Sequence, residues 1–374
     1  MIRRFVNLVE QNFPARSYSL HRLDVAKHLF YPSTADAEAA NAKEEEIKKK
    51  NNGSGSGGKP KPPLPSSEGR ILYAAKEGGH CLLHDADEGV ICSLPSLDFP
   101  MGDIGRPHIT FSVPGAGGPG KEHESLYVMR SDDDDGRSTG FVVLDFNEPR
   151  RKWQRLPPPP CADEPGGSSG TIKSFTVLDG GRTICVYDRD TTYATYCFDT
   201  ASREWRHAGD WSLPFDGRAE HVPELNTWLG FCPEQPRHLC AADLSAIGGI
   251  SQAPPLQQVW EDFNPPPKKE WSKVLNPRYP DYVLGRTKWW TAEAAELVNL
   301  GSGRFCTAKF FQIQGEQSIG FHVNDTLDEE FFLVLTGVEV VRGGGGEEEG
   351  GLRMVRHKSK RYSFTNDCSI DWVL

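Results

Sequence analysis

The sequence predicts an all-β protein, and within that class a β-propeller of six blades, each with four antiparallel strands. Three observations lead to this prediction. Short runs rich in β-branched and aromatic residues recur along the chain, with Gly, Asp or Pro between them. A pattern of strand, acidic turn and aromatic residue recurs, mostly at steps of about 44 to 61 residues, near the roughly 40 to 50 residues of a propeller blade. Hardly any segment has helical periodicity.

The repeated pattern is clearest in residues 196–215, which read YCFDTASREWRHAGDWSLPF. An apolar strand ends at Asp199, a polar turn follows, and the chain resumes at Trp205 before a Leu-Pro stop. The turn aspartate can accept hydrogen bonds from backbone N–H groups about two residues on. The tryptophan supplies apolar surface between neighbouring blades. Similar stretches occupy residues 81–95, 141–157 and 238–260, with weaker copies at 18–33 and 333–359.

Complete blades can be read around three of these stretches. The clearest blade has predicted strands at residues 172–179, 182–188, 194–199 and 204–209. The preceding blade has strands at 108–113, 125–130, 141–146 and 152–157, and the following one at 219–223, 227–232, 238–243 and 257–260. Stacked sheets bury both faces only if the ring closes. We therefore expect the first strand, within IRRFVNLV, to pair with the last, within CSIDWVL, in the sixth blade.

The predicted domain organisation is one propeller domain over residues 1–374 with two inserts. Residues 35–68 are charged and then rich in Gly and Pro, and we expect them to be disordered. Their first part has a short run of helical spacing that would be marginal as an isolated helix. Residues 261–290 are rich in Pro and Lys and are predicted to be a loop insert.

Composition restricts the partners and the cellular location. The net charge is -10, which disfavours nucleic acid as a partner, and we expect a monomer that does not bind membranes. Nine cysteines lack a C-x-x-C pair and stand mostly in strand-like runs, so we expect buried, reduced thiols and a cytoplasmic or nuclear location. The early arginines would also fit a mitochondrial address, but RFVNLV is better explained as a strand.

Several motifs together resemble a known family. They are RRFVNLV, YSLHRLDVAKHLFYPS, SFTVLDGGRTICV, TYCFDTASREWRHAGDWSLPF, HLCAADLS, LVNLGSGRFC and LTGVEVVR with LRMVRHKSKRYSF. The sequence is similar in these motifs to a large family of uncharacterised proteins expanded in grasses, a domain of unknown function with kelch-like propeller character. The resemblance implies a plant protein, a propeller and no established activity. Some plant kelch-type propellers are ubiquitin-ligase receptors, but the F-box that usually accompanies them has no counterpart in the first 70 residues.

The sequence predicts no site for catalysis, a cofactor or a metal, because a structural role explains each candidate better. His80 and His84 have no third metal ligand at a suitable spacing. The aspartate run 132–135 lacks the alternating ligands and closing Glu of a calcium loop. Neither a nucleophile elbow nor a phosphate-binding loop is present. We therefore predict no cofactor.

Two local features are candidates for partner binding. The first is the basic run that contains Arg353, Arg356, Lys358 and Lys360, which could instead be a solvated edge strand. The second is the pair Trp289 and Trp290, which could instead pack between blades. We predict a non-catalytic protein-interaction module with an unidentified protein partner. The alternatives are a ubiquitin-ligase substrate receptor and a small-ligand-binding or enzymatic propeller that uses the mouth of the central channel.

Overall fold

The computed structural model divides the chain into two compact units. The first unit comprises Met1–Leu64, Glu234–Leu239 and Trp260–Leu374, and the second comprises Pro65–Pro233 and Cys240–Val259. The structure describes residues 3–15, 17–48, 70–74, 80–85, 90–97, 108–114, 124–130, 140–146, 148, 151–160, 172–247, 252–263, 265–319, 322–326, 330–343, 351–364 and 368–373. Most of these residues lie in strands, so the prediction of a mostly β protein is confirmed.

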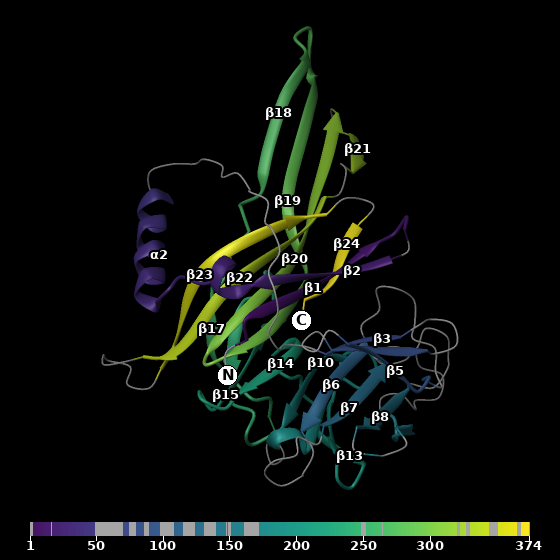
Figure 1. Cartoon of the computed structure of the whole chain (residues 1–374). Coiled ribbons are helices and arrows are strands. Elements are labelled where there is room, and N and C mark those ends of the chain that lie inside the picture. The colour runs from purple at the N-terminus through teal and green to yellow at the C-terminus, as the bar shows by residue number, and fades with distance from the viewer. Residues whose placement is uncertain are drawn as a thin grey trace. The chain divides into compact units, whose positions relative to one another are not determined.

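The second unit consists of sheets whose strands follow one another along the chain (Figure 1). Its strands are β3 (Arg70–Ala74), β4 (Cys81–Asp85), β5 (Val90–Leu94), β6 (His108–Pro114), β7 (Glu124–Arg130), β8 (Phe141–Asp145), β9 (Trp153–Arg155), β10 (Ile172–Leu178), β11 (Thr183–Asp188), β12 (Thr195–Asp199), β13 (Glu204–Gly209), β14 (Asp216–Val222), β15 (Thr227–Phe231), β16 (Leu239–Ala242) and β17 (Leu256–Trp260). A three-stranded sheet, β3 to β5, precedes three four-stranded runs, β6 to β9, β10 to β13 and β14 to β17. Each of the twelve strands predicted for three blades overlaps one of these strands.

The sheets of the second unit pack face to face in chain order, because alternate residues of a strand point to opposite sides. On β7, Leu126 and Val128 pack with residues of β4 and β5, whereas Tyr127 and Met129 pack with residues of β10 to β12. The alternation recurs on β11 and β12: Ile184, Val186, Tyr196 and Phe198 face the preceding sheet, and Cys185 and Cys197 face the following one. Inner sheets therefore bury both faces, as the prediction of stacked short sheets requires.

Tryptophans at the start of the fourth strands tie neighbouring sheets together. The indole Nε1 of Trp153 on β9 donates to the carbonyl oxygen of Pro95 at 2.8 Å, and Trp205 on β13 donates to Pro157, also at 2.8 Å. Both prolines belong to the Leu-Pro stop of the preceding sheet. The Trp205 ring also packs against Phe141, with the ring centroids 5.8 Å apart. The repeated sequence pattern thus places a hydrogen-bonding aromatic residue and its acceptor one sheet apart.

The predicted acidic turns are confirmed at Asp199 and Asp243. The Asp199 carboxylate accepts the N–H groups of Ala201 and Ser202, both at 2.9 Å, and these bonds lower the pKa of Asp199. Asp243 accepts the N–H of Ser245 in the same way. The two weaker copies are different. Asp24 caps helix α1 (Val25–His28), and Glu339 lies within a long strand, so residues 18–33 and 333–359 are not copies of this turn.

The first unit contains two sheets. Its strands are β1 (Phe5–Asn12), β2 (Ser17–Asp24), β18 (Lys269–Asn276), β19 (Tyr279–Gly301), β20 (Arg304–Ile319), β21 (His322–Thr326), β22 (Glu330–Arg342), β23 (Leu352–Ser363) and β24 (Cys368–Val373). The larger sheet has the order β18-β19-β20-β22-β23, with β21 paired to β20. The smaller has the order β2-β1-β24, so the predicted pairing of the two ends of the chain is confirmed. Neither sheet has the four-stranded form of a blade.

Both predicted inserts contain regular structure. Helix α2 (Thr34–Lys48) occupies the start of the insert predicted to be disordered, and residues 49–68 lie outside the described residues. Ser33 starts this helix because its hydroxyl accepts the N–H of Asp36. Tertiary contacts also stabilise the helix, since the Asn41 side chain donates to the Arg356 carbonyl of β23. The predicted loop at 261–290 contains β18 and the beginning of β19.

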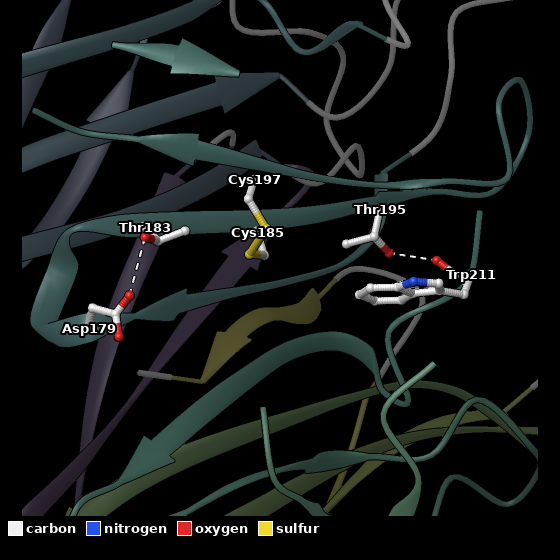
Figure 2. The surroundings of a disulfide bond; sticks show 6 residues. All are labelled: Asp179, Thr183, Cys185, Thr195, Cys197 and Trp211. Carbon is white, nitrogen blue, oxygen red and sulfur yellow. Dashed lines mark hydrogen bonds between the residues drawn. A yellow bond between two sulfur atoms is a disulfide. The ribbon is translucent and has the colours of Figure 1, made fainter. Parts of the chain in front are cut away.

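The prediction of reduced thiols is wrong for one pair of cysteines. Cys185 and Cys197 lie directly opposite each other on β11 and β12, with Cα atoms 4.2 Å apart, and form a disulfide (Figure 2). This Cα distance is typical of a non-hydrogen-bonded cross-strand pair, in which side chains approach closely. The cysteines at 81, 92, 232, 240, 306 and 368 are not part of a disulfide.

Candidate protein-interaction surface

The strand β18 of the first unit is exposed along its whole length and pairs with the first part of β19. We call β18 and residues 279–289 of β19 the arm. A turn at 277–278 joins the strands, and the Asn276 side chain stabilises it by accepting the N–H of Arg278 at 2.9 Å. All eight residues of β18 are exposed, and β18 is an edge of its sheet. Figure 1 shows the arm extending beyond β22 and β23 of the same sheet.

The pairing register gives the arm two chemically different faces. Residues directly opposite in an antiparallel pair share a face. One face carries the pairs Lys269 with Lys288, Trp271 with Arg286, and Lys273 with Leu284. We call these six residues the basic face. The opposite face carries polar residues, including Glu270 beside Thr287, which in turn pairs with Glu316 of β20.

The basic face combines exposed apolar surface with an unbalanced charge. Trp271 is 49% exposed, and the Arg286 guanidinium lies 5.9 Å from the centre of its ring, which organises the two side chains. Four of the six residues are Lys or Arg. Lys269 and Lys288 lie directly opposite each other, and like charges at such positions repel. In sequence, residues 268–288 hold six basic and two acidic residues in a chain of net charge -10. An anionic partner would relieve this repulsion.

The arm also presents apolar residues outside the basic face. Val274, Leu275 and Tyr279 are 47%, 46% and 57% exposed. Together with Trp271 they account for four of the fourteen large hydrophobic residues that are exposed among those the structure describes. Such a concentration on one short hairpin is typical of an interaction surface rather than of scattered surface residues.

A second polar cluster in the first unit joins the N-terminal segment to the large sheet. The Glu339 carboxylate on β22 accepts from Thr34 at 2.7 Å and from Arg304 at 3.2 Å, and His357 lies 3.4 Å from it. The other ring nitrogen of His357 accepts the N–H of Tyr31 at 3.2 Å. Burial lowers the pKa of His357. The bonds to Thr34, Arg304 and His357 outweigh the effect of burial on Glu339 and lower its pKa. These contacts hold the segment around α1 and α2 against β22 and β23, so the role of this cluster is structural.

A cavity of about 160 Å³ adjoins this cluster and is smaller than the roughly 300 to 1,000 Å³ of most ligand sites. Its lining residues are Arg3, Arg4, Val25, Ala26, Phe30, Leu300 and Arg304. Two of its arginines already pair with carboxylates, Arg4 with Asp24 and Arg304 with Glu339. Among the residues that the structure describes, no three His, Cys, Asp or Glu side chains gather as a metal site would need.

A buried ion pair stabilises the same unit. The Lys309 ammonium on β20 lies 2.8 Å from the Asp262 carboxylate, and both residues are at most 1% exposed. The same carboxylate oxygen accepts the N–H of Leu239 at 3.1 Å. The pair therefore holds three separate stretches of the first unit together, and neither charge is presented to solvent.

The residues predicted to bind a partner are involved in intramolecular contacts. Trp290 packs against Phe311 and Phe332 in an apolar cluster, while the indole of Trp289, on the other face of β19, donates to Gln314. Of the basic residues on β23, Arg353 pairs with Glu38 of α2 and the Arg356 carbonyl accepts from Asn41. Lys358 lies over the Tyr31 ring and Lys360 over the Tyr362 ring. Trp289 and Trp290 thus lie at the base of the arm, and the basic residues of β23 lie elsewhere in the sheet.

Sequence reasoning missed the basic face because the prolines at 265–267 made the whole segment look like a loop. A signal was nevertheless present. Lys269, Trp271 and Lys273 alternate on one side of a short run, and Arg286 and Lys288 alternate on another. The Asn-Pro turn lies nearly midway between these two runs, which predicts a hairpin that brings them together.

The fold and the surface define a mostly β protein with a chain of stacked sheets and an exposed basic hairpin. The chain belongs to the family described as protein of unknown function (DUF1668), whose model matches residues 3–362. No curated protein matches the sequence significantly. Among the residues that the structure describes, no helix has the length and apolarity needed to cross a membrane.

Two solved structures have limited similarity to the chain. One is the β-propeller domain of Cps50 (Swd1) from Myceliophteria thermophila, with 13% identity over 72% of this chain and 76% of that one, and a TM-score of 0.33. The other is a lipopolysaccharide binding protein, with 8% identity over 98% of this chain and 85% of that one, and a TM-score of 0.18. TM-scores this low do not establish a common fold.

Proposed function

We propose that this protein is a non-catalytic protein-interaction module and that the arm binds its protein partner. The observation that supports this most is the exposure of Trp271 at 49% among the lysines and arginine of the basic face. Exposed aromatic residues and arginines are the side chains most often responsible for binding energy at protein interfaces. Two of the three arginines that line the cavity, by contrast, are already paired with carboxylates, which favours a binding module over an enzyme.

The proposal includes a finer description of the fold. The three-stranded sheet and the three four-stranded runs of the second unit stack in chain order. The first strands of the last two runs, β10 and β14, pair in parallel and join these runs in one eight-stranded sheet. Both features support consecutive blades of a β-propeller. The six-stranded and three-stranded sheets of the first unit do not have the form of a blade, so we propose blades for the second unit alone.

Affinity purification with quantitative mass spectrometry tests the proposed function. Three baits are compared. The first is the wild type, and the second, the arm variant, carries Trp271→Ser and Lys273→Glu. The third is a matched control with Ile91→Ser, which replaces a residue of the second unit that is 65% exposed. We expect a specific set of proteins to be retained by the wild type and the control and lost from the arm variant. Identical sets from all three baits would contradict the proposed function.

A further inference from the structure

The arm also indicates what kind of partner segment it would bind. This inference rests on the proposed function and deepens it. We propose that the partner supplies an extended segment with acidic residues at every second position, which adds to the sheet as a new strand beside β18.

The position of β18 supports strand addition. It is an edge of its sheet, and its eight residues are all exposed. An edge strand has a row of backbone N–H and C=O groups that point away from its neighbour, and an extended peptide can pair with them. Natural edges are commonly protected by lysines, and Lys269 and Lys273 would repel another strand of like charge. The same lysines would favour an acidic strand.

The register predicts the spacing of the acidic residues. A strand added to β18 would place the side chains opposite Lys269, Trp271 and Lys273 on the basic face, because directly opposed residues share a face. Acidic residues opposite Lys269 and Lys273 would therefore stand four positions apart, and the acidic residue between them would lie opposite Trp271. The residues between these would lie on the face of Glu270, where small polar residues avoid repulsion.

Charge complementarity disfavours a second copy of the arm. Two β18 strands paired edge to edge would bring four lysines together, two from each copy. Like charges placed opposite each other destabilise a strand pair. An acidic segment from a protein partner is therefore the occupant that the observations favour.

The test uses fluorescein-labelled decapeptides and fluorescence anisotropy with the full chain. The first peptide alternates Glu with Thr and Val. A control peptide has the same composition with the glutamates in blocks, and a third carries backbone N-methyl groups on alternate residues, which removes the donors that a new strand needs. We expect the alternating peptide to bind at least tenfold more tightly than either of the others.

Protein variants relate binding to the basic face. Lys269→Glu with Lys273→Glu should weaken binding of the alternating peptide at least tenfold, whereas Glu316→Gln, on the other face, should not weaken it. Circular dichroism establishes that the variants are folded. If variant and wild type bind alike, the inference is wrong.

Two further outcomes would overturn the inference. One is equal binding of the N-methylated and unmodified peptides, which would show a purely electrostatic contact without strand addition. In that case the proposed function still stands if the arm variant loses its partners in the affinity purification. The other is preferential binding of single-stranded oligonucleotide to the same lysines, which would make nucleic acid the occupant and would also contradict a protein partner at the arm.

Discussion

The hydrogen bond from the Trp205 indole to the Pro157 carbonyl oxygen joins neighbouring sheets, and removing its N–H donor tests how much this bond contributes to stability. Trp205→Phe keeps most of the ring but removes the indole N–H that donates to Pro157 at 2.8 Å. Because this bond is partly exposed, we expect a loss of about 0.5 to 1.5 kcal/mol in the free energy of unfolding. Trp153→Phe removes the equivalent bond to Pro95 and should cost a similar amount.

Trp205→Ala removes the ring as well as the bond. Its ring lies 5.1 Å from that of Phe198 and 5.8 Å from that of Phe141, measured between centroids, so cavity formation adds to the loss. A fully buried tryptophan would cost about 3 to 5 kcal/mol. Since Trp205 is only partly buried, we expect about 2 to 3 kcal/mol in total.

Urea denaturation followed by circular dichroism measures both losses as shifts of the transition midpoint. The matched control is His207→Ala on the same strand, at a residue that is exposed in the structure. An unchanged midpoint for Trp205→Phe and Trp205→Ala would refute the role of this residue between sheets. If Trp205→Phe loses as much stability as Trp205→Ala, the conclusion that the ring contributes in addition to the hydrogen bond is wrong.

Three further predictions concern ionisable groups of the first unit, and urea midpoints measure each of them. Lys309→Met leaves the buried Asp262 carboxylate without its ammonium and should lower the free energy of unfolding by about 3 to 5 kcal/mol. Adding Asp262→Asn to the same chain should restore part of this stability. A double variant less stable than Lys309→Met would contradict the prediction. Burial raises the pKa of Glu296 from 4.5 to about 7, so its stabilising contribution is complete below pH 4.5 and is lost as the pH rises to 7. Glu296→Gln should therefore remove this loss of stability between pH 4.5 and 7, which is at most about 3 kcal/mol. Parallel curves of stability against pH for variant and wild type would contradict this prediction. The lowered pKa values of Glu339 and His357 predict the opposite dependence, since each group contributes stability at high pH that is lost as acid protonates it. His357→Gln should reduce the loss of stability at low pH. An unchanged dependence of the urea midpoint on pH would contradict the role of this cluster in stabilising the N-terminal segment.

How much the sequence could predict depended on whether the relevant contacts were local. The strands from β6 to β17 were predictable, because alternating apolar residues and turn signals at Asp199 and Asp243 repeat along the chain. The disulfide was nearly predictable: Cys185 and Cys197 lie at equal distances from the β11–β12 turn, although strand register had to be known before they could be paired.

The first unit was harder to predict because its stability depends on distant contacts. Lys309 reads as a surface residue until Asp262, 47 positions earlier in the chain, is placed beside it. Helix α2 is marginal by itself, and contacts with β23 stabilise it. The basic face of the arm requires both the hairpin and its register, so neither of its two basic runs indicates the surface alone.

Hydrogen exchange at β18 is the most direct measurement of the proposed function and partner. An exposed edge strand exchanges its outward-facing amides rapidly when free, and pairing with an added strand slows them. We predict that the alternating acidic peptide protects amides within Lys269–Asn276, while amides in β23 keep their exchange rates. Unchanged exchange in β18 at a peptide concentration that saturates binding would contradict the account.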